Sequence, residues 1–201
     1  MKIVVYGATG MVGSQVAEAA LARGHEVTAV SRSGAELAGA TARAADIADT
    51  DRLVALAASA DAVVIAIPTD RTGGPTEPMV DAHSRLIAAH PAARLLVVGG
   101  AGSLSVGDGL LVDAPGFPDA YKPESKAFTA ILDDYRASNG LDWTLVSPSP
   151  VIAPGEPTGY VLGTDSPVGD SVTTSDFADA IVDELETPAY KGRRFTVASK
   201  A

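Results

Sequence analysis

The sequence predicts an α/β fold, in which a doubly wound, mainly parallel sheet has helices on both faces and the strand order 3-2-1-4-5-6. Short continuous apolar runs rich in valine and isoleucine recur along the chain, which is typical of strands buried on both faces of a parallel sheet. Ala- and Leu-rich helical segments separate these runs, and strands that alternate with helices imply right-handed βαβ units. A glycine-rich turn joins the first run to the first helix. No internal repeat or linker interrupts the pattern, so we expect a single domain over residues 1–201.

The expected strands and helices can be placed in order along the chain. The first strand, "KIVVY", is apolar except for its first residue. The first helix ends near Gly24 and the fourth near Gly140, because glycine is favoured at helix C-caps. The last helix is predicted to have Ser175 as its N-cap and to end before Pro188. The expected strands are 2–6, 25–30, the segment before 46, 61–67, 94–100, 142–147 and 193–199, and the expected helices are 11–24, 49–60, 77–90, 124–140 and 174–187.

Three irregular stretches interrupt this alternation, near residues 68–78, 100–122 and 147–170. Each of them follows an expected strand, so all three are expected at the carboxyl edge of the sheet. Ligands of doubly wound folds bind at this edge. The three loops are therefore predicted to form a substrate pocket.

The first turn, "GATGMVG", carries three glycines between a buried strand and a helix. Glycine costs backbone entropy, so its use here needs a physical reason. Gly7, Gly10 and Gly13 permit a sharp turn, a close approach of the backbone to a ligand and packing of the helix on the sheet. The helix that begins near Met11 directs its unpaired N–H groups and positive dipole end at that ligand, which suits a pyrophosphate. A tight turn without a ligand is the alternative. The place of this turn, between a buried strand and a helix, favours a Rossmann-type dinucleotide site.

The end of the second strand indicates which dinucleotide binds. An NAD site usually carries an acid there, which binds both ribose hydroxyls. This chain has Ser31, Arg32 and Ser33 instead, and a guanidinium can hold the 2′-phosphate of NADP through two bonds. We therefore expect NADPH to be preferred over NADH; the alternative is that Arg32 is a solvated loop residue. Asp46 and Ile47 follow the third strand and either flank the adenine ring or serve an ordinary helix N-cap.

The predicted cofactor site combines these residues with the ends of the fourth and fifth strands. All of its positions lie where expected strands end or where a following turn or helix begins, at one edge of the sheet. The site comprises Gly7, Thr9, Gly10, Met11, Val12, Gly13, Ser31, Arg32, Ser33, Asp46, Ile47, Ala66, Ile67, Gly99 and Gly100.

Composition argues against several other functions. The absence of cysteine fits a reducing cytoplasm and excludes disulfides, a thiol nucleophile and a thiolate metal site. The net charge of -10 repels phosphodiester backbones, so no nucleic-acid partner is expected. No apolar stretch approaches the roughly 18 residues of a membrane span, and none of the three histidines has a second ligand at metal spacing. We expect a cytoplasmic monomer or homodimer that binds a small-molecule substrate, and no metal.

Longer motifs give the chain a family resemblance. "GATGMVG", the basic "SR" after the second strand, "LLVVGGAGSL", "FPDAYKPE" and "LDWTLVSPSPVIAPGEPTG" resemble the atypical short-chain dehydrogenases of the NADH-flavin reductase group. These are relatives of biliverdin reductase B and of the NmrA-like proteins. The resemblance runs over nearly the full length, and "GGAGSL" and "APGEPTG" point to the narrower group. It implies a cofactor-binding fold and reduction with a nicotinamide cofactor.

The acid machinery of short-chain dehydrogenases is only partly present. That machinery needs a tyrosine with a lysine four residues later on one helix face, and a serine that orients the substrate. Here Ser125 stands four residues after Tyr121, whereas Lys126 stands five residues after it, about 140° away around a helix. Ser103 follows the fifth strand near the family's serine, and a loop hydroxyl that caps a turn is the alternative. The candidate catalytic residues are Ser103, Tyr121 and Lys126.

An incomplete acid site favours acceptors that need no strong acid. Reduction of a ketone develops an alkoxide, whereas a flavin or an extended tetrapyrrole spreads the charge over a conjugated system. The sequence therefore predicts an NADPH-dependent reductase of a flat conjugated acceptor, with FMN or FAD as possible substrates. Arg71, Lys122 and Lys126 either meet a flavin or cofactor phosphate or are simply solvated. The alternatives are an NADP(H)-binding redox sensor of the NmrA-like kind and an epimerase-type enzyme, which would normally need the Tyr/Lys pair.

Overall fold

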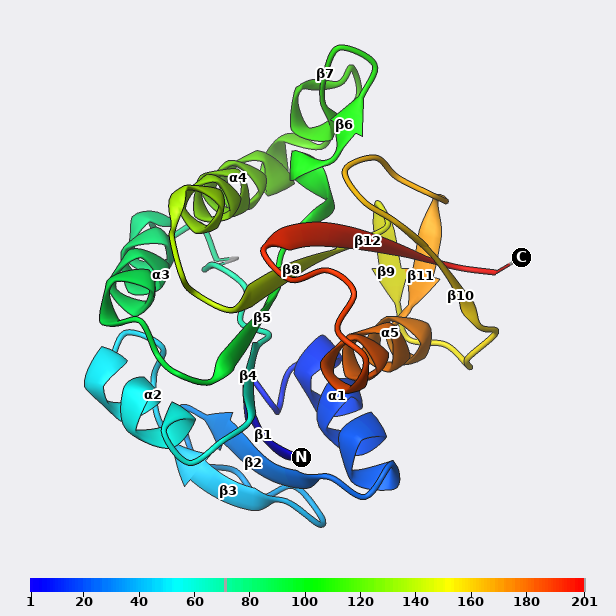
Figure 1. Ribbon diagram of the computed structural model, residues 1–201. Coiled ribbons are helices and arrows are strands. Elements are labelled where there is room, and N and C mark those ends of the chain that lie inside the picture. The colour runs from blue at the N-terminus through cyan, green and yellow to red at the C-terminus, as the bar shows by residue number, and fades with distance from the viewer. Residues whose placement is uncertain (71, 201) are drawn as a thin grey trace.

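A computed structural model describes residues 1–70 and 72–200, and an eight-stranded sheet runs through its centre (Figure 1). The strand order is β10-β12-β8-β5-β4-β1-β2-β3, and every neighbouring pair is parallel except β10 with β12. The predicted order 3-2-1-4-5-6 is confirmed, with β8 as the sixth strand, and β12 and β10 extend the sheet beyond it. The strands are β1 (Lys2–Tyr6), β2 (Glu26–Ser31), β3 (Thr41–Ala44), β4 (Ala62–Ile65), β5 (Arg94–Val98), β8 (Trp143–Pro148), β10 (Tyr160–Gly163) and β12 (Arg193–Ser199).

Helices cover both faces of the sheet, as a doubly wound fold requires (Figure 1). One face carries α1 (Met11–Ala22) and α5 (Thr174–Glu186), which pack against each other. The opposite face carries α2 (Thr50–Ala57), α3 (Glu77–Ala89) and α4 (Lys122–Ala137). Among the described residues, no helix is both long and apolar enough to cross a membrane.

Each face of the sheet has its own apolar core, because the side chains of a strand alternate between faces. In β1, Ile3 and Val5 belong to the core with α1 and α5, whereas Val4 and Tyr6 belong to the core with α2, α3 and α4. All four side chains are buried, and burial of a large apolar side chain contributes about 1.5–3 kcal/mol. The continuous apolar run of this strand therefore serves two cores at once.

The irregular stretches contain short elements that the sequence did not predict. The strands β6 (Ser105–Val106) and β7 (Gly109–Leu110) form an antiparallel hairpin that projects from the body of the molecule (Figure 1). The strands β9 (Val151–Ala153) and β11 (Ser171–Thr173) pair in parallel as a second small sheet. Three single turns of 3-10 helix complete the long loop after β5, at Ala101–Ser103, Leu111–Asp113 and Asp119–Tyr121.

The beginning of α5 differs from the prediction that Ser175 is its N-cap. The N-cap is Thr173, whose hydroxyl accepts a hydrogen bond from the Asp176 amide at 3.0 Å. The Ser175 hydroxyl instead donates to the Gly155 carbonyl at 2.8 Å, which ties the loop after β9 to the helix. Three consecutive hydroxyl residues, 173–175, all suit an N-cap. Only the contacts made by the folded chain select among them.

A buried histidine lies between α3 and α4. The His83 side chain is fully buried, its Nδ1 lies 3.1 Å from the Tyr135 hydroxyl, and the two rings meet edge to face. Burial lowers the pKa of His83 to about 4, because the apolar surroundings disfavour the charged imidazolium. In the unfolded chain a histidine titrates at about 6.5. His83 is therefore neutral in the folded protein at neutral pH.

This histidine is expected to make the fold less stable in acid. Between about pH 6.5 and pH 4 the unfolded chain binds a proton at His83 that the folded chain does not, so stability falls as the pH falls through this window. The free energy of unfolding should drop by about 2 kcal/mol from this group between pH 7.5 and pH 5. Urea unfolding of the wild type and of His83→Gln at both pH values measures the difference.

The matched control is His90→Asn. His90 is exposed and has a positive φ of 49°, a conformation that asparagine also tolerates. The control should keep the wild-type pH dependence, whereas His83→Gln should lose about 2 kcal/mol of it. An unchanged pH dependence in His83→Gln would show that this side chain takes up its proton normally in the fold.

Candidate functional site

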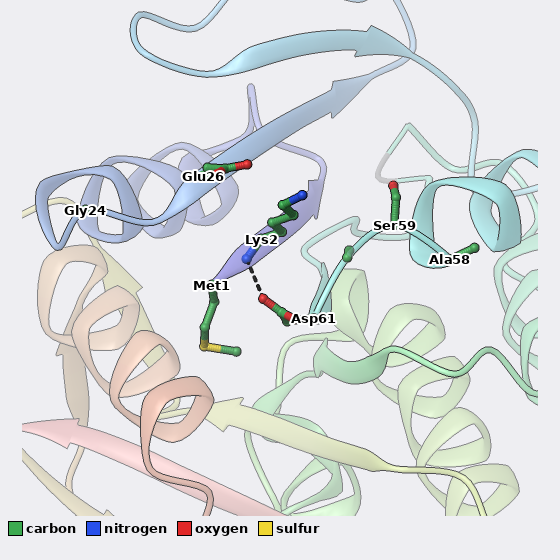
Figure 2. Close-up of a pocket in the computed structure, with 8 residues that line it drawn as sticks. Met1, Lys2, Gly24, Glu26, Ala58, Ser59 and Asp61 are labelled. Carbon is green, nitrogen blue, oxygen red and sulfur yellow. Dashed lines mark hydrogen bonds between the residues drawn. The ribbon is translucent and has the colours of Figure 1, made fainter.

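Two hollows lie at opposite edges of the sheet. Figure 2 shows the first, of about 570 Å³, whose lining includes Met1, Lys2, Glu26 and Asp61. It is open and polar, and the Lys2 amide donates to Asp61 at 2.7 Å across it. Lys2 and Glu26 begin β1 and β2, so this hollow lies at the amino edge, away from the glycine turn. The second, a cavity of about 790 Å³, lies at the carboxyl edge and receives the ends of β4, β5 and β8.

The turn after β1 requires a glycine at its first position. Gly7 has a φ of +82°, which L side chains rarely adopt. A Cβ atom there would lie less than 3.0 Å from the carbonyl oxygen of Ala66, at the end of β4. The Gly7 amide donates to the Val30 carbonyl at 2.9 Å and so fixes the turn against β2. Gly7 therefore serves the shape of the turn itself.

The other two glycines of the turn have different surroundings. A Cβ atom on Gly13 would lie less than 3.0 Å from the Gly7 carbonyl, so α1 can pack on the turn only with glycine at this position. A Cβ atom on Gly10 would meet only the Gly7 oxygen, at 3.2 Å, and Gly10 lines the cavity. Gly10 is thus the glycine of this turn whose missing side chain leaves room for a ligand.

The first turn of α1 has the features of an anion site. Gly10 is the N-cap and provides no side-chain cap, and the first turn contains no acid. Ser14 donates its amide to Gly10 at 3.0 Å, which leaves the amides of Met11, Val12 and Gly13 without an acceptor in the helix. These amides and the positive end of the helix dipole favour negative charge. Met11 and Val12 also line the cavity, so the turn fits the pyrophosphate of a dinucleotide.

The three polar residues after β2 are not equivalent. Ser31 is buried, and its hydroxyl accepts a hydrogen bond from the Ala35 amide at 3.1 Å. Arg32 and Ser33 are exposed at the same end of the strand. Across from them, bonds from the Thr72 hydroxyl and amide hold the pKa of Asp70 below its ordinary value, and the positive charge of Arg32 lowers it further. The Arg32 charge therefore acts on the loop that follows β4.

The acids after β3 hold the local backbone. Asp46 accepts a hydrogen bond from the Ala48 amide at 2.9 Å, and Asp49 caps α2 by accepting from the Arg52 amide at 3.0 Å. Ile47 is buried between them. The N-cap alternative is thus realised by Asp49, and contact of Asp46 and Ile47 with an adenine ring stays a prediction.

The cavity continues from the glycine turn into an apolar region formed by the three loops. Ala66, Ile67, Gly99 and Gly100 line it, as their prediction for the cofactor site requires, although no ligand contact is thereby tested. A Cβ atom on Gly100 would meet nothing within 4 Å, so the wall is open at this point. The remaining walls combine aliphatic and small residues with aromatic and proline side chains, and the latter are Pro68, Pro115, Phe117, Pro118, Tyr121, Phe128, Pro148, Pro150 and Phe177.

The predicted catalytic serine is held by an arginine that the sequence did not point to. Ser103 is buried, and Arg194 of β12 donates to both its hydroxyl, at 2.9 Å, and its carbonyl, at 2.8 Å. Arg194 also pairs with Asp165 at 2.5 Å, and Ser103 is not among the residues that line the cavity. These contacts favour a structural role for the Ser103 hydroxyl, and its catalytic role stays an untested prediction.

The other two candidate catalytic residues lie apart. Tyr121 is the N-cap of α4, is 57% exposed and lines the cavity. Lys126 is exposed and does not line the cavity. Glu124 and Ser125, in the first turn of the same helix, line it instead, and neither was predicted from the sequence as a site residue. Their place shortly after the tyrosine, in the first turn of a helix, is the signal that could have identified them.

Lys122 and Arg71 are the remaining cations near the loops for which the sequence predicts either a phosphate contact or solvation. Lys122 was expected before α4, but it is the first residue of the helix, and its ammonium pairs with Asp119 at 2.6 Å. Arg71 lies outside the described residues. Within the described part of the chain, no group of three or more histidine, aspartate or glutamate side chains could hold a metal ion.

The glycine turn, the α1 amides and the cavity together fit a nicotinamide dinucleotide, and comparison with known proteins agrees. Residues 7–188 match the family described as NAD(P)H-binding. The chain belongs to this NAD(P)H-binding family. The match covers both the turn after β1 and the residues that form the rest of the cavity.

Three solved structures are similar to the whole chain. A candidate exported protein of Burkholderia pseudomallei is 36% identical, with a TM-score of 0.88 over 98% of this chain and 99% of that chain. A candidate NADH-flavin reductase of Streptococcus pneumoniae is 33% identical, with a TM-score of 0.81 over 100% of both chains. A candidate epimerase of Bacteroides thetaiotaomicron is 34% identical, with a TM-score of 0.87 over 100% of this chain and 97% of that chain. These findings support an oxidoreductase of the atypical short-chain dehydrogenase group.

Proposed function

We propose that the protein is an NADPH-dependent oxidoreductase that transfers hydride to a flavin or a similar flat conjugated acceptor. The observation that carries this proposal is the continuity of one cavity, which extends from the glycine turn at Gly10 to the aromatic side chains of the three loops. Its volume of about 790 Å³ lies in the range of small-molecule sites. The similarity to a candidate NADH-flavin reductase supports the same reaction class.

The cofactor preference is proposed from the end of β2. Arg32 and Ser33 are exposed where a 2′-phosphate would lie, and no acid occupies this position. An acid here would favour the ribose hydroxyls of NADH, whereas a guanidinium favours a phosphate. NADPH is therefore the proposed reductant.

The residues of this chain would position the cofactor and the acceptor, and none of them would need to act as a general acid. When bound, the dinucleotide supplies a hydride from its nicotinamide ring. The α1 amides and Arg32 would fix the phosphates, while Gly100, where a Cβ atom would meet nothing within 4 Å, would leave room for the ring. The aromatic walls would stack the acceptor and exclude water from one face. Such orientation supplies a large rate gain without a titrating side chain, and solvent supplies the proton that a reduced flavin takes up.

The candidate acid residues are accordingly expected to matter little. Tyr121→Phe and Lys126→Ala should each lower kcat by less than the roughly 100-fold expected when a positioned general acid is lost. The reason is geometric, because Lys126 does not line the cavity and Tyr121 is largely exposed. Steady-state kinetics with NADPH and a flavin measure the effect. A fall of more than about 100-fold for Tyr121→Phe would establish it as the acid that this proposal omits.

The reaction is tested by following NADPH oxidation with FMN, FAD, riboflavin and a quinone under anaerobic conditions, so that oxygen does not recycle the acceptor. The proposal expects at least one of them to raise the rate above that of the enzyme-free mixture. Tight NADPH binding without turnover of any acceptor would favour a redox-sensing binding protein. The observation that favours this second function is that Tyr121 lines the cavity whereas Lys126 does not.

An epimerase-type enzyme is the third candidate, and the similarity to a candidate epimerase is its support. Turnover of small ketones or sugar substrates, with flavins left unreduced, would favour it.

The remaining properties stay predictions. They are residence in the cytoplasm, a small-molecule substrate, the absence of a nucleic-acid partner, and a monomeric or homodimeric state. Size-exclusion chromatography with light scattering settles the oligomeric state.

A further inference from the structure

We propose that the Ser125 hydroxyl donates a hydrogen bond to a carbonyl oxygen on the ring of the acceptor. The inference rests on the proposed function, and it narrows the substrate class to flat conjugated rings that carry a carbonyl group at their edge, as flavins and quinones do. Ser125 is a specificity-determining residue in this proposal. It binds and orients the acceptor and takes no part in hydride transfer.

Ser125 is a buried polar residue at the wall of the cavity. It lies in the first turn of α4, is 7% exposed and lines the cavity. A Cβ atom on Gly102 would lie less than 3.0 Å from the Cβ and Oγ atoms of Ser125, so the serine side chain packs against the turn after β5. Gly100, Ala101 and Gly102 of that turn also line the cavity. The hydroxyl therefore stands where α4 meets the carboxyl edge of the sheet.

The proton of this hydroxyl is not used by the fold. A hydroxyl in a helix can donate to the carbonyl four residues earlier. Thr129 does so, to the Ser125 carbonyl at 2.8 Å, and Ser84 of α3 bonds the Val80 carbonyl in the same way at 3.1 Å. Within the part of the chain that the structure describes, the Ser125 hydroxyl donates to no group. A buried donor without an acceptor is costly, and an oxygen atom of a ligand in the cavity would satisfy it.

The neighbours of Ser125 on α4 favour a ring as the bonding partner. Tyr121 stands four residues before Ser125 and Phe128 three residues after it, and side chains at these spacings share a helix face. Both aromatic residues line the cavity. A flat conjugated ring suits a wall of this kind, because aromatic side chains offer large surfaces for stacked or edge-on contact. The hydroxyl between them would meet the edge of the ring, where flavins and quinones share the carbonyl oxygen as a neutral acceptor.

Riboflavin is the probe for this contact. It is titrated by fluorescence quenching into the protein saturated with NADP⁺, which requires no turnover. Ser125→Ala should weaken riboflavin binding about 5-fold, the loss expected for one neutral hydrogen bond. The infrared band of the carbonyl groups of the bound flavin should move to higher frequency in this variant, because a carbonyl that accepts no hydrogen bond has a stiffer C=O bond.

The matched control is Ser147→Ala. Ser147 of β8 is fully buried, and its hydroxyl has no hydrogen-bond partner among the described residues, but it does not line the cavity. Each substitution removes a buried hydroxyl without leaving a partner unpaired, so neither should lower the melting temperature of the ligand-free protein. Ser147→Ala should keep the wild-type affinity for riboflavin. A lower melting temperature for Ser125→Ala would show that the fold uses this hydroxyl and would overturn the proposal.

A titration of NADP⁺ without riboflavin separates the acceptor from the cofactor, because the nicotinamide carboxamide also carries a carbonyl group. The NADP⁺ affinity should be the same in Ser125→Ala and in the wild type. A loss as large as that for riboflavin overturns the proposal by assigning the hydroxyl to the cofactor.

The other outcomes separate this inference from the proposed function. Unchanged riboflavin affinity in Ser125→Ala overturns the inference, and so does an unshifted carbonyl band or a failure of riboflavin to bind the wild type. The absence of NADPH oxidation with riboflavin bound would instead contradict the proposed function and leave the binding result intact.

Discussion

Replacement of Gly10 by valine is expected to abolish productive NADPH binding while the protein stays folded. Gly10 lines the cavity beside the α1 amides, and a side chain there would occupy the path of the pyrophosphate. If two charge-assisted hydrogen bonds of about 1.5 kcal/mol each are lost, the affinity falls about 100-fold or more. Calorimetric titration of NADPH into the wild type and Gly10→Val measures this loss.

The neighbouring glycine provides the contrast for this experiment. A Cβ atom on Gly13 would lie less than 3.0 Å from the Gly7 carbonyl, whereas Gly10 has only one neighbour, at 3.2 Å. Gly13→Ala should therefore lower the melting temperature markedly, and Gly10→Val should lower it little. Retention of NADPH affinity within about 3-fold in a folded Gly10→Val protein would show that the pyrophosphate does not approach this turn.

The second large effect is expected at Arg32. Its replacement by alanine should weaken NADPH binding by about 10- to 150-fold, because a bond to the charged 2′-phosphate contributes about 1.5–3 kcal/mol. NADH lacks this phosphate, so its affinity should change little. Titration of both cofactors into the wild type and Arg32→Ala gives the four dissociation constants that the comparison needs.

An arginine on the adjacent strand serves as the control. Arg43 is exposed on β3, and its guanidinium donates to the Ala42 carbonyl at 2.8 Å. Arg43→Ala changes the net charge of the protein as Arg32→Ala does, but it should keep the NADPH preference. Equal affinity of the wild type for NADPH and NADH would refute the role assigned to Arg32.

The sequence predicted the sheet because its central strands are buried on both faces. Runs such as "KIVVY" must be apolar throughout when each face has its own core, and this pattern is visible without a structure. The need for glycine at positions 7 and 13 could also be predicted from the sequence. In the structure, packing excludes a Cβ atom at both positions. The order of the first six strands followed from the connection rules.

The short strands and the contacts of the loops were not predictable in the same way. β9, β10 and β11 are three or four residues long and lie among prolines and glycines, so they carry little periodic signal. The bond from Arg194 to Ser103 joins residues 91 positions apart. No local pattern encodes such a contact. For the same reason the sequence placed Ser103 with the catalytic candidates and passed over Glu124, which lines the cavity.

The most direct test of the account is a crystal structure of the protein with NADP⁺ and riboflavin. The account predicts the pyrophosphate on the amides of Met11 and Val12, the 2′-phosphate on Arg32 and the flavin ring stacked on the nicotinamide, among the aromatic walls of the same cavity. A dinucleotide bound away from the turn after β1 would contradict the account. So would a flavin bound outside this cavity, because one continuous cavity at the carboxyl edge of the sheet is the basis of the proposed hydride transfer.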